Sequence, residues 1–254
     1  MKMKRYLALL TCAVLTAGLL VGCGGQKPPA SSGATSSTPG GSSSSTGGSS
    51  VSEPAAPDPI TLNLAYMPNY GALWAVMSAE KNGYFAEEGI TVNMVPFDAG
   101  PAEIAAMEGG SIDVAYIGHG AHKLCSSGQA SILLIQHLGN ADCVIGLKSH
   151  GVESIADLKG KTVAYAPASS SEIILKLALE ANGMTMDDIK GYAMEASNMV
   201  AAASSGSVDA IATWSPASLQ ILDILADDGV KLCGNVDYAE NSVSPGSWVV
   251  NPKY

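Results

Sequence analysis

Residues 105–121 read AAMEGGSIDVAYIGHGA, and residues 201–217 read AAASSGSVDAIATWSPA. The two stretches align without a gap, because a small-residue helix, a Gly-Ser turn, an Asp, a strand and a polar tip follow one another in both. A second pair of matches lies upstream of each, where AYMP or AYAP precedes a helix that ends in Asn-Gly. Matches in register at offsets of 96 to 100 residues indicate two similar lobes.

Strand-like apolar runs alternate with helix-like stretches from Ile60 onward. This alternation predicts an α/β fold with mixed, mostly parallel sheets. We place lobe 1 at residues 58–140 and lobe 2 at 141–241, and residues 242–254 form a strand that returns to lobe 1.

The first 57 residues do not have the composition of a folded domain. A basic start, an apolar stretch and Gly22-Cys23 predict an export signal over residues 1–22. LVGC at residues 20–23 resembles the lipobox of bacterial lipoproteins, which implies that Cys23 is lipidated. Residues 23–57 are rich in Ser and Gly and predict a flexible linker. We therefore expect an extracytoplasmic protein that is lipid-anchored to the bacterial cell membrane.

Charge excludes one class of partner. The chain carries a formal charge of -10, and removal of residues 1–22 takes away Lys2, Lys4 and Arg5, which gives -10 - 3 = -13. A chain this acidic is not expected to bind nucleic acid. Arg5 is the last arginine, so the bidentate guanidinium fork for oxyanions is missing from the predicted lobes.

Three cysteines follow Cys23, namely Cys125, Cys143 and Cys233, and none forms a Cys-x-x-Cys pair. A single disulfide among them is an alternative in an exported protein. Cys143 and Cys233 lie in strand-like runs, however, which favours buried free thiols.

The tips that follow the strands are the candidate site. In open α/β sheets, ligands bind beyond the carboxyl ends of the strands, at the start of the following helices. Facing lobes would bring these tips to one cleft. The predicted ligand-binding residues are Asn69, Tyr70, Gly71, Gly118, His119, Gly120, Ser169, Ser170, Ser171, Asn198, Thr213, Trp214 and Ser215.

Several of these residues have a plainer interpretation as well. One serine of Ser169–Ser171 would suffice as a helix cap, but three hydroxyls beside free helix amides favour a cradle for an anion or polar group. Tyr70 either covers the end of the first strand or contacts the ligand. Trp214 is interpreted as a flat cleft wall.

The histidines near the tip at residues 118–120 are not predicted to bind a metal or to act as a catalytic base. His119 and His122 lack a third metal ligand, and His119 has no Ser or Cys partner with an orienting acid. His119 is therefore expected to cap a helix or to donate to the ligand. Asp113 and Asp209 recur at strand starts, far from the tips, and are expected to cap turns. No catalytic residue, metal or cofactor is predicted.

Four motifs carry a family resemblance that covers nearly everything from residue 60 to 250. They are GYFAEEGI at 83–90, GSID at 110–113, DLKGKTV at 157–163 and SVDAIATW at 207–214. The chain resembles the substrate-binding proteins of bacterial ABC importers, in the nitrate/sulfonate/taurine group that also includes binders of thiamine-type pyrimidine precursors. The resemblance implies a two-lobed periplasmic-binding-protein fold of type II, and a monomer that captures a small sulfonate, nitrate-like anion or related solute. Its partners would be a permease with its cytoplasmic ATPase.

Two departures from the group bear on function. Members often have Trp-Glu-Pro where this chain has Trp214-Ser215-Pro216, and the chain stops at WVVNPKY where the family usually continues. We therefore expect a C-terminally shortened chain with bare apolar surface on lobe 1. The alternatives are a pyrimidine-precursor binder or an enzyme on the same fold that makes such a pyrimidine. Hinges are expected near residues 139–142 and 241–247.

Overall fold

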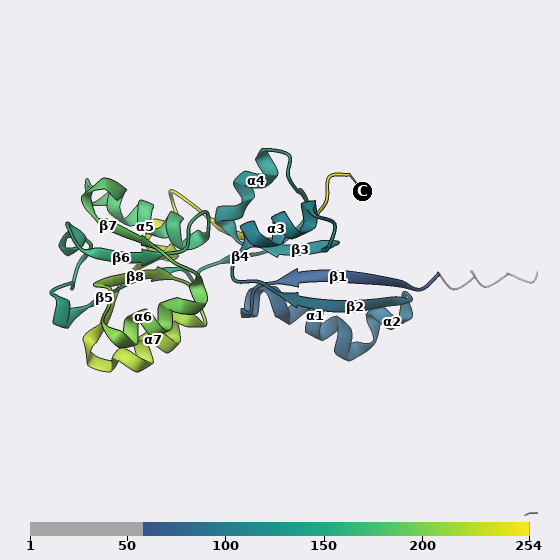
Figure 1. The fold of residues 1–254 in the computed structure, drawn as a ribbon, viewed down its shortest axis with the longest axis horizontal. Helices are drawn as coiled ribbons and strands as arrows, with labels where there is room; N and C mark the ends of the chain where they lie inside the picture. The colour runs from purple at the N-terminus through teal and green to yellow at the C-terminus, as the bar shows by residue number, and fades with distance from the viewer. Residues whose placement is uncertain (1–57, 254) are drawn as a thin grey trace, which may run out of the picture. The chain divides into compact units, whose positions relative to one another are not determined.

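The computed structural model describes residues 58–253. The predicted signal peptide, the lipidation site Cys23 and the linker up to residue 57 lie outside the described residues. The described part belongs to one compact unit and holds two five-stranded sheets (Figure 1). We call the sheet with the first strand, together with its helices, lobe 1, and the other lobe 2.

The lobe 1 sheet has the strand order β2-β1-β3-β10-β4. Its strands are β1 (Ile60–Tyr66), β2 (Ile90–Pro96), β3 (Val114–Ile117), β4 (Ser131–Gly139) and β10 (Ser244–Val250). Strand β1 is parallel to β2 and β3, whereas β10 is antiparallel to β3 and β4.

The lobe 2 sheet repeats this arrangement with the order β7-β6-β8-β5-β9. Its strands are β5 (Cys143–Leu147), β6 (Thr162–Tyr165), β7 (Lys190–Ala193), β8 (Ala210–Thr213) and β9 (Gly229–Gly234). Strand β6 is parallel to β7 and β8, and β5 is antiparallel to β8 and β9. The predicted two-lobed α/β fold with mixed sheets is confirmed. The chain passes between the sheets twice, from β4 to β5 and from β9 to β10.

Helices cover both faces of each sheet, so each lobe has three layers (Figure 1). The α-helices are α1 (Tyr70–Asn82), α2 (Tyr84–Glu87), α3 (Gly100–Glu108), α4 (His122–Ser126), α5 (Ser170–Ala181), α6 (Met199–Ser205) and α7 (Ala217–Leu225). Short 3-10 helices are η1 (His119–Ala121), η2 (Lys148–His150), η3 (Ile155–Leu158), η4 (Met186–Asp188), η5 (Ala196–Asn198), η6 (Ala226–Asp228) and η7 (Asn235–Tyr238). Buried clusters on α1 and α3 sandwich the first sheet, and those on α5 and α6 sandwich the second.

The ends of the helices follow from local sequence. Asn69 accepts a hydrogen bond from the Ala72 N–H at 2.8 Å and so caps α1. Gly83 and Gly183, the glycines of the two Asn-Gly stops, have φ angles of 78° and 70°. These left-handed conformations favour glycine, which explains why both helices stop at the same dipeptide.

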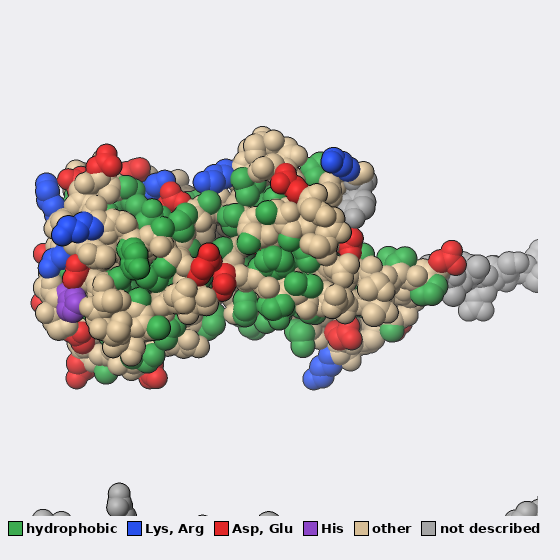
Figure 2. Space-filling view, viewed as in Figure 1, with side chains coloured by type: hydrophobic (Ala, Val, Ile, Leu, Met, Phe, Trp, Pro, Cys, Tyr) green, Lys and Arg blue, Asp and Glu red, His purple; other side chains and the backbone are tan. Residues whose placement is uncertain are grey.

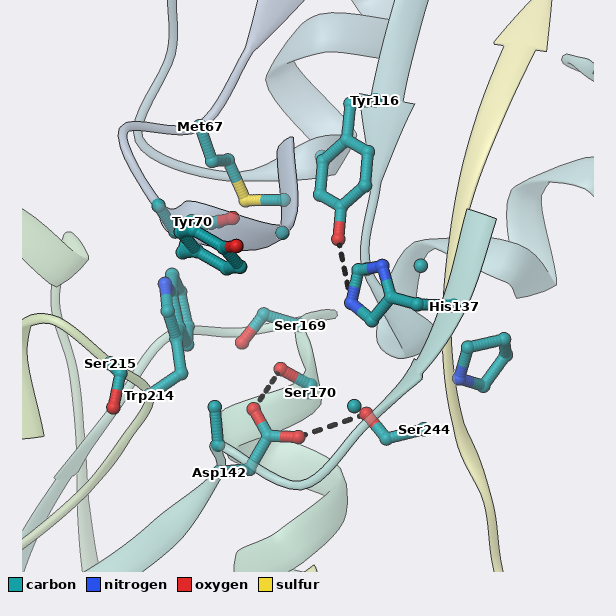
Figure 3. A pocket seen from close by; sticks show the side chains of 18 of the residues that line it. Met67, Tyr70, Tyr116, His137, Asp142, Ser169, Ser170, Trp214, Ser215 and Ser244 are labelled. Carbon is teal, nitrogen blue, oxygen red and sulfur yellow. Dashed lines mark hydrogen bonds between the residues drawn. The ribbon is translucent and has the colours of Figure 1, made fainter. Parts of the chain in front are cut away.

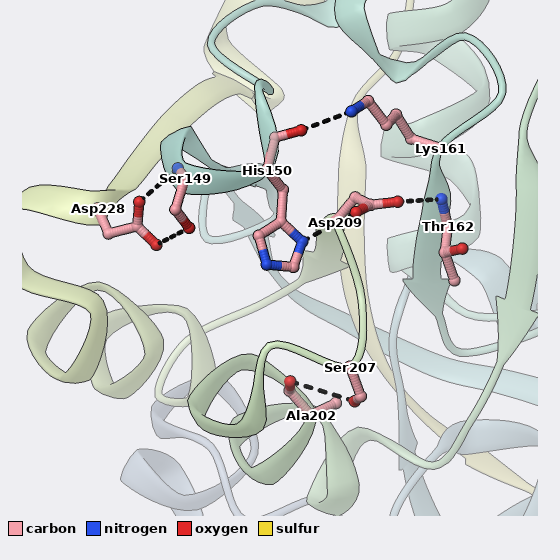
Figure 4. A network of polar contacts seen from close by, with 8 residues as sticks. All are labelled: Ser149, His150, Lys161, Thr162, Ala202, Ser207, Asp209 and Asp228. Atoms are coloured by element: carbon pink, nitrogen blue, oxygen red, sulfur yellow. Dashed lines mark hydrogen bonds and ion pairs between the residues drawn. The ribbon is translucent and has the colours of Figure 1, made fainter.

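The recurring aspartates Asp113 and Asp209 tie the strands together at the end of each sheet that is remote from the tips. Asp113 accepts a hydrogen bond from the Asn63 N–H at 2.7 Å. In lobe 2, Asp209 accepts one from the Thr162 N–H at 2.7 Å (Figure 4). Asp209 also meets His150 Nδ1 at 2.9 Å. Each aspartate thus joins two strands rather than capping a turn, which corrects the expected turn-capping role, and the repeat extends to these hydrogen bonds.

Strand β4 lies at the edge of the lobe 1 sheet and exposes large apolar side chains on both faces. They are Ile132, Leu133, Leu134, Ile135 and Leu138. An exposed apolar edge strand is a ready site for pairing with another chain segment. Hydrophobic side chains also reach the surface elsewhere on both lobes (Figure 2).

The three described cysteines are free, with Cys143 and Cys233 buried and Cys125 half-buried. Burial raises the pKa of the Cys143 thiol to about 11. Within residues 58–253, no helix is long and apolar enough to cross a membrane.

Candidate functional site

A cavity of about 330 Å³ lies where the tips of the two lobes meet. Lobe 1 contributes the loop from β1 into α1, the end of β3 and the start of β10, and lobe 2 contributes the loop before α5 and the residues after β8. The crossing from β4 to β5 forms part of the wall. This is the place that the sheet rule predicts for a ligand.

Eight of the thirteen predicted site residues line this cavity. They are Asn69, Tyr70, Gly71, Gly118, Ser169, Ser170, Trp214 and Ser215. The other five, His119, Gly120, Ser171, Asn198 and Thr213, do not line it. All four tips that follow the strands, at residues 69–71, 118–120, 169–171 and 214–216, therefore reach one cavity, although individual side chains at those tips point elsewhere.

Ser171, Asn198 and Thr213 have other surroundings. The Ser171 hydroxyl is buried and accepts a hydrogen bond from the Ala166 N–H at 2.9 Å, so it shapes the turn before α5. Asn198 is exposed at the start of α6. The Thr213 hydroxyl is buried under the tip and has no hydrogen-bond partner among the described residues.

His119 and Gly120 form the short helix η1 beside the cavity. The His119 ring makes an edge contact with His122, with 6.5 Å between ring centroids, and burial followed by the charge of His122 lowers its pKa. No group of three His, Cys, Asp or Glu residues that could hold a metal occurs in the described part of the chain. Gly120 is buried against lobe 2, and a Cβ on it would lie 2.2 Å from the Ser169 carbonyl carbon.

Trp214 joins the two lobes across the cavity. Its half-buried side chain packs against the buried cluster of lobe 2 that contains Ile211 and against the lobe 1 cluster that contains Met67. Tyr70, on the opposite lobe, is 84% exposed although it lines the cavity. The contact of Gly120 with Ser169 and the packing of Trp214 are thus direct contacts between the lobes beside the cavity.

The serine tip directs its hydroxyl protons into the protein. Ser169 Oγ donates to the Ala166 carbonyl at 2.7 Å and accepts from the Ser171 N–H at 3.2 Å. Ser170 Oγ donates to Asp142 Oδ1 at 2.5 Å (Figure 3). These hydroxyls therefore present oxygen lone pairs, rather than protons, to a ligand.

Asp142 is a cavity residue that sequence reasoning missed as a site residue. Its buried carboxylate accepts hydrogen bonds from Ser170, from Asn235 Nδ2 at 2.9 Å and from Ser244 Oγ at 2.9 Å (Figure 3). Asn235 and Ser244 belong to the second crossing, so Asp142 connects both crossings to the start of α5. Its place in the predicted hinge at residues 139–142 was the signal that could have drawn attention to it.

Tyr116 and His137 form a second pair that the sequence did not single out. Their rings stack with 6.0 Å between centroids and 12° between planes, and Tyr116 Oη lies 3.3 Å from His137 Nε2 (Figure 3). Burial raises the pKa of Tyr116 well above its ordinary value and lowers that of His137. Both side chains are therefore neutral at pH 7.

The cavity lining contains no Lys or Arg, and Asp142 is its one carboxylate. Glu103 on α3 is fully buried, and neither of its side-chain oxygens has a partner among the described residues. Burial raises the pKa of Glu103 well above its usual value, and Glu103 does not line the cavity. The cavity therefore carries a net negative charge from Asp142.

Known proteins share the sequence and the fold. Residues 73–233 match the family described as NMT1/THI5 like. A relative in Brucella abortus, named as a binding protein, is 32% identical over 195 residues, which is 77% of this chain and 60% of the relative. The taurine-binding periplasmic protein of Escherichia coli is 26% identical over 62% of this chain and 48% of its own. The chain thus spans about 60% of the length of the Brucella relative.

Two solved structures show the same architecture. The alkanesulfonate-binding protein SsuA from Xanthomonas axonopodis pv. citri, bound to MOPS, has a TM-score of 0.62 and 25% identity, covering 78% of this chain and 68% of its own. The nitrate-binding protein NrtA from Synechocystis PCC 6803 has a TM-score of 0.63 and 16% identity, covering 77% and 56%. The fold is that of type II periplasmic binding proteins. The extent of the family match, over residues 73–233, shows that the chain belongs to the NMT1/THI5-like family.

Proposed function

We propose that this protein is the extracytoplasmic solute-binding component of an ABC importer, which captures one small molecule between its lobes and delivers it to a permease with a cytoplasmic ATPase. The cavity that both lobes line is the observation that carries the proposal. Relatives named for binding taurine and aliphatic sulfonates support it.

The predicted anchor fits this role. A lipid on Cys23 and a Ser/Gly linker up to residue 57 would keep the lobes near the membrane while leaving them free to meet the permease. The protein would act as a monomer. These features are proposals that rest on the sequence.

Ligand capture would close the lobes about the two crossings. Binding favours a closed state through contacts that exist in that state alone. Trp214 supplies such contacts, since it packs against buried clusters of both lobes. The proposed role is binding without turnover. An enzyme that makes a pyrimidine would need reactive groups assembled around the substrate, and the cavity offers one neutral histidine, His137.

Two ligand classes follow from the relatives and the cavity walls. The named relatives suggest a small sulfonate or nitrate-like anion. The aromatic side chains of Tyr70 and Trp214 suggest instead a flat ring, such as a pyrimidine precursor, which could stack on them.

A thermal-shift screen tests the function. The full chain is heated with methanesulfonate, taurine, nitrate and hydroxymethylpyrimidine, and we expect one class to raise the Tm in proportion to its concentration. Trp214→Ala is the matched variant that should lose the shift. No stabilisation by any compound, together with no small molecule retained by the purified protein, would contradict a solute-binding role.

A further inference from the structure

We propose that the solute carries a cationic nitrogen that meets the Asp142 carboxylate between aromatic walls, and that simple oxyanions are rejected. This inference rests on the proposed function and names the ligand class of the same cavity. Four observations support it. They are the burial of Asp142 without a charged partner, the orientation of the serine hydroxyls, the lack of Lys and Arg in the cavity lining, and the aromatic side chains in that lining.

The Asp142 carboxylate is buried with neutral partners alone. Its oxygens accept hydrogen bonds from Ser170, Asn235 and Ser244, which are all uncharged donors. The ion pairs among the described residues are His150 with Asp209, Lys159 with Asp188 and Lys176 with Glu172, so Asp142 has none. Buried charges are usually paired, because removing an ion from water is costly. A ligand cation would supply the missing countercharge.

The hydroxyls of Ser169 and Ser170, at the start of α5, do not donate into the cavity. Ser169 gives its proton to the Ala166 carbonyl, and Ser170 gives its proton to Asp142. The start of α5 could itself attract an anion through its helix dipole. Asp142 already holds Ser170 at that position, so an oxyanion there would face a carboxylate.

The cavity lacks the cations that a sulfonate or nitrate site would use. No Lys or Arg lines it. Lys231, on β9, does not line the cavity, and its ammonium approaches Gly234 and makes no ion pair among the described residues. His137 is kept neutral by burial, which lowers its pKa. The field that an entering ligand meets is therefore negative.

Aromatic rings complete the walls. Tyr70 and Trp214 lie on one side of the pocket and Tyr116 on another, with Asp142 at its base in the view of Figure 3. Aromatic faces attract cations through the ring quadrupole, and the attraction is stronger where the contact is desolvated. Tyr70 is largely exposed and would gain burial against such a ligand.

A charge series on one ring tests the inference. Benzamidinium, benzamide and benzenesulfonate share a phenyl ring and differ in charge, and tetramethylammonium with nitrate forms a second pair. Titration calorimetry on the full chain is expected to give binding of the two cations, with benzamidinium at least about tenfold tighter than benzamide. Binding of benzenesulfonate or nitrate in preference to the cations would overturn the inference while leaving the solute-binding function intact. If none of the five compounds binds, the inference is also overturned. The solute-binding function is contradicted only if the compounds of the thermal-shift screen do not bind either.

Variants assign the effect to Asp142. Asp142→Asn should weaken benzamidinium binding about thirtyfold or more and leave benzamide unchanged, whereas the exposed Asp223→Asn should change neither. Because Asp142→Asn could unfold the crossings, Asn140→Lys serves as a second variant, since Asn140 is an exposed residue of the lining. It should weaken benzamidinium binding relative to Asn140→Gln. Equal affinity for benzamidinium in wild type and both charge variants would contradict the proposal.

Discussion

The tips after β3 and β8 are equivalent positions of the repeat, but they make different contacts. Gly118, His119 and Gly120 follow the strand in lobe 1, and Trp214, Ser215 and Pro216 follow it in lobe 2. The lobe 1 tip lets backbone approach backbone, because Gly120 packs against Ser169. The lobe 2 tip supplies a large aromatic wall. In this duplicated fold, the lobe 1 tip thus contributes the contact between the lobes and the lobe 2 tip contributes a wall of the cavity.

The largest effect is expected at Gly120. A Cβ there would lie 2.2 Å from the Ser169 carbonyl carbon, a backbone atom that cannot move aside easily. Gly120→Ala should therefore prevent full closure and weaken solute binding about tenfold to a hundredfold. Calorimetry with whichever solute raises the Tm measures this.

Gly118→Ala is the matched control for Gly120→Ala. Its added Cβ would meet the Met67 side chain at 3.9 Å, which is an ordinary contact. Equal loss of solute affinity in the two variants would contradict the assignment of Gly120 to the contact between the lobes and of Gly118 to the cavity lining.

The next effect compares the two aromatic walls. Trp214→Ala should lower the free energy of unfolding by about 2 kcal/mol, because the ring packs against buried clusters of both lobes. Tyr70→Ala should change it by less than about 0.5 kcal/mol, since Tyr70 is 84% exposed. Urea unfolding of the ligand-free protein separates them. Equal destabilisation would show that Trp214 does not join the lobes in solution.

The smallest effect is expected at Asp209, at the end of the lobe 2 sheet that is remote from the tips. Burial raises the pKa of Asp209, but the hydrogen bonds from Thr162 and His150 outweigh it and hold that pKa below its usual value. A lowered pKa means that Asp209 stabilises the fold above pH 4 and loses this contribution as the pH falls further. Asp209→Ala should cost about 1.5 kcal/mol at pH 7.

The pH dependence provides the check on Asp209. The difference in unfolding free energy between wild type and Asp209→Ala should shrink between pH 5 and pH 3, measured by urea unfolding. A difference that stays constant over this range would mean that the carboxylate charge does not contribute.

The sequence predicted the fold well because the repeat is local in each lobe. The two Asn-Gly stops, the Asp at each strand start and the strand-then-tip pattern are short signals that the chain carries twice. They fixed the order of β1, β3, β6 and β8 and placed all four tips at one cavity. Because ligands bind beyond the carboxyl ends of strands in open α/β sheets, these signals were enough to predict where the cavity lies.

The site was harder to predict in its details. Whether a tip side chain faces the cavity depends on the rotation of the turn, so Ser171 and Thr213 point inward although their neighbours line the cavity. Asp142 and His137 meet the cavity through packing between the lobes, and Tyr116 aligns with Ala212 in the repeat. No short pattern marks such residues, because their role depends on distant segments.

The central claim is that the two lobes close on one small solute through the contact between Gly120 and Ser169. Native mass spectrometry of the full chain, incubated with the sulfonate, nitrate, pyrimidine and cation probes together, tests it most directly. We expect one bound molecule in wild type and in Gly118→Ala, and at a probe concentration near the wild-type Kd an occupancy lower by about tenfold or more in Gly120→Ala. Equal occupancy in wild type and Gly120→Ala, or a wild-type chain that binds nothing, would contradict it.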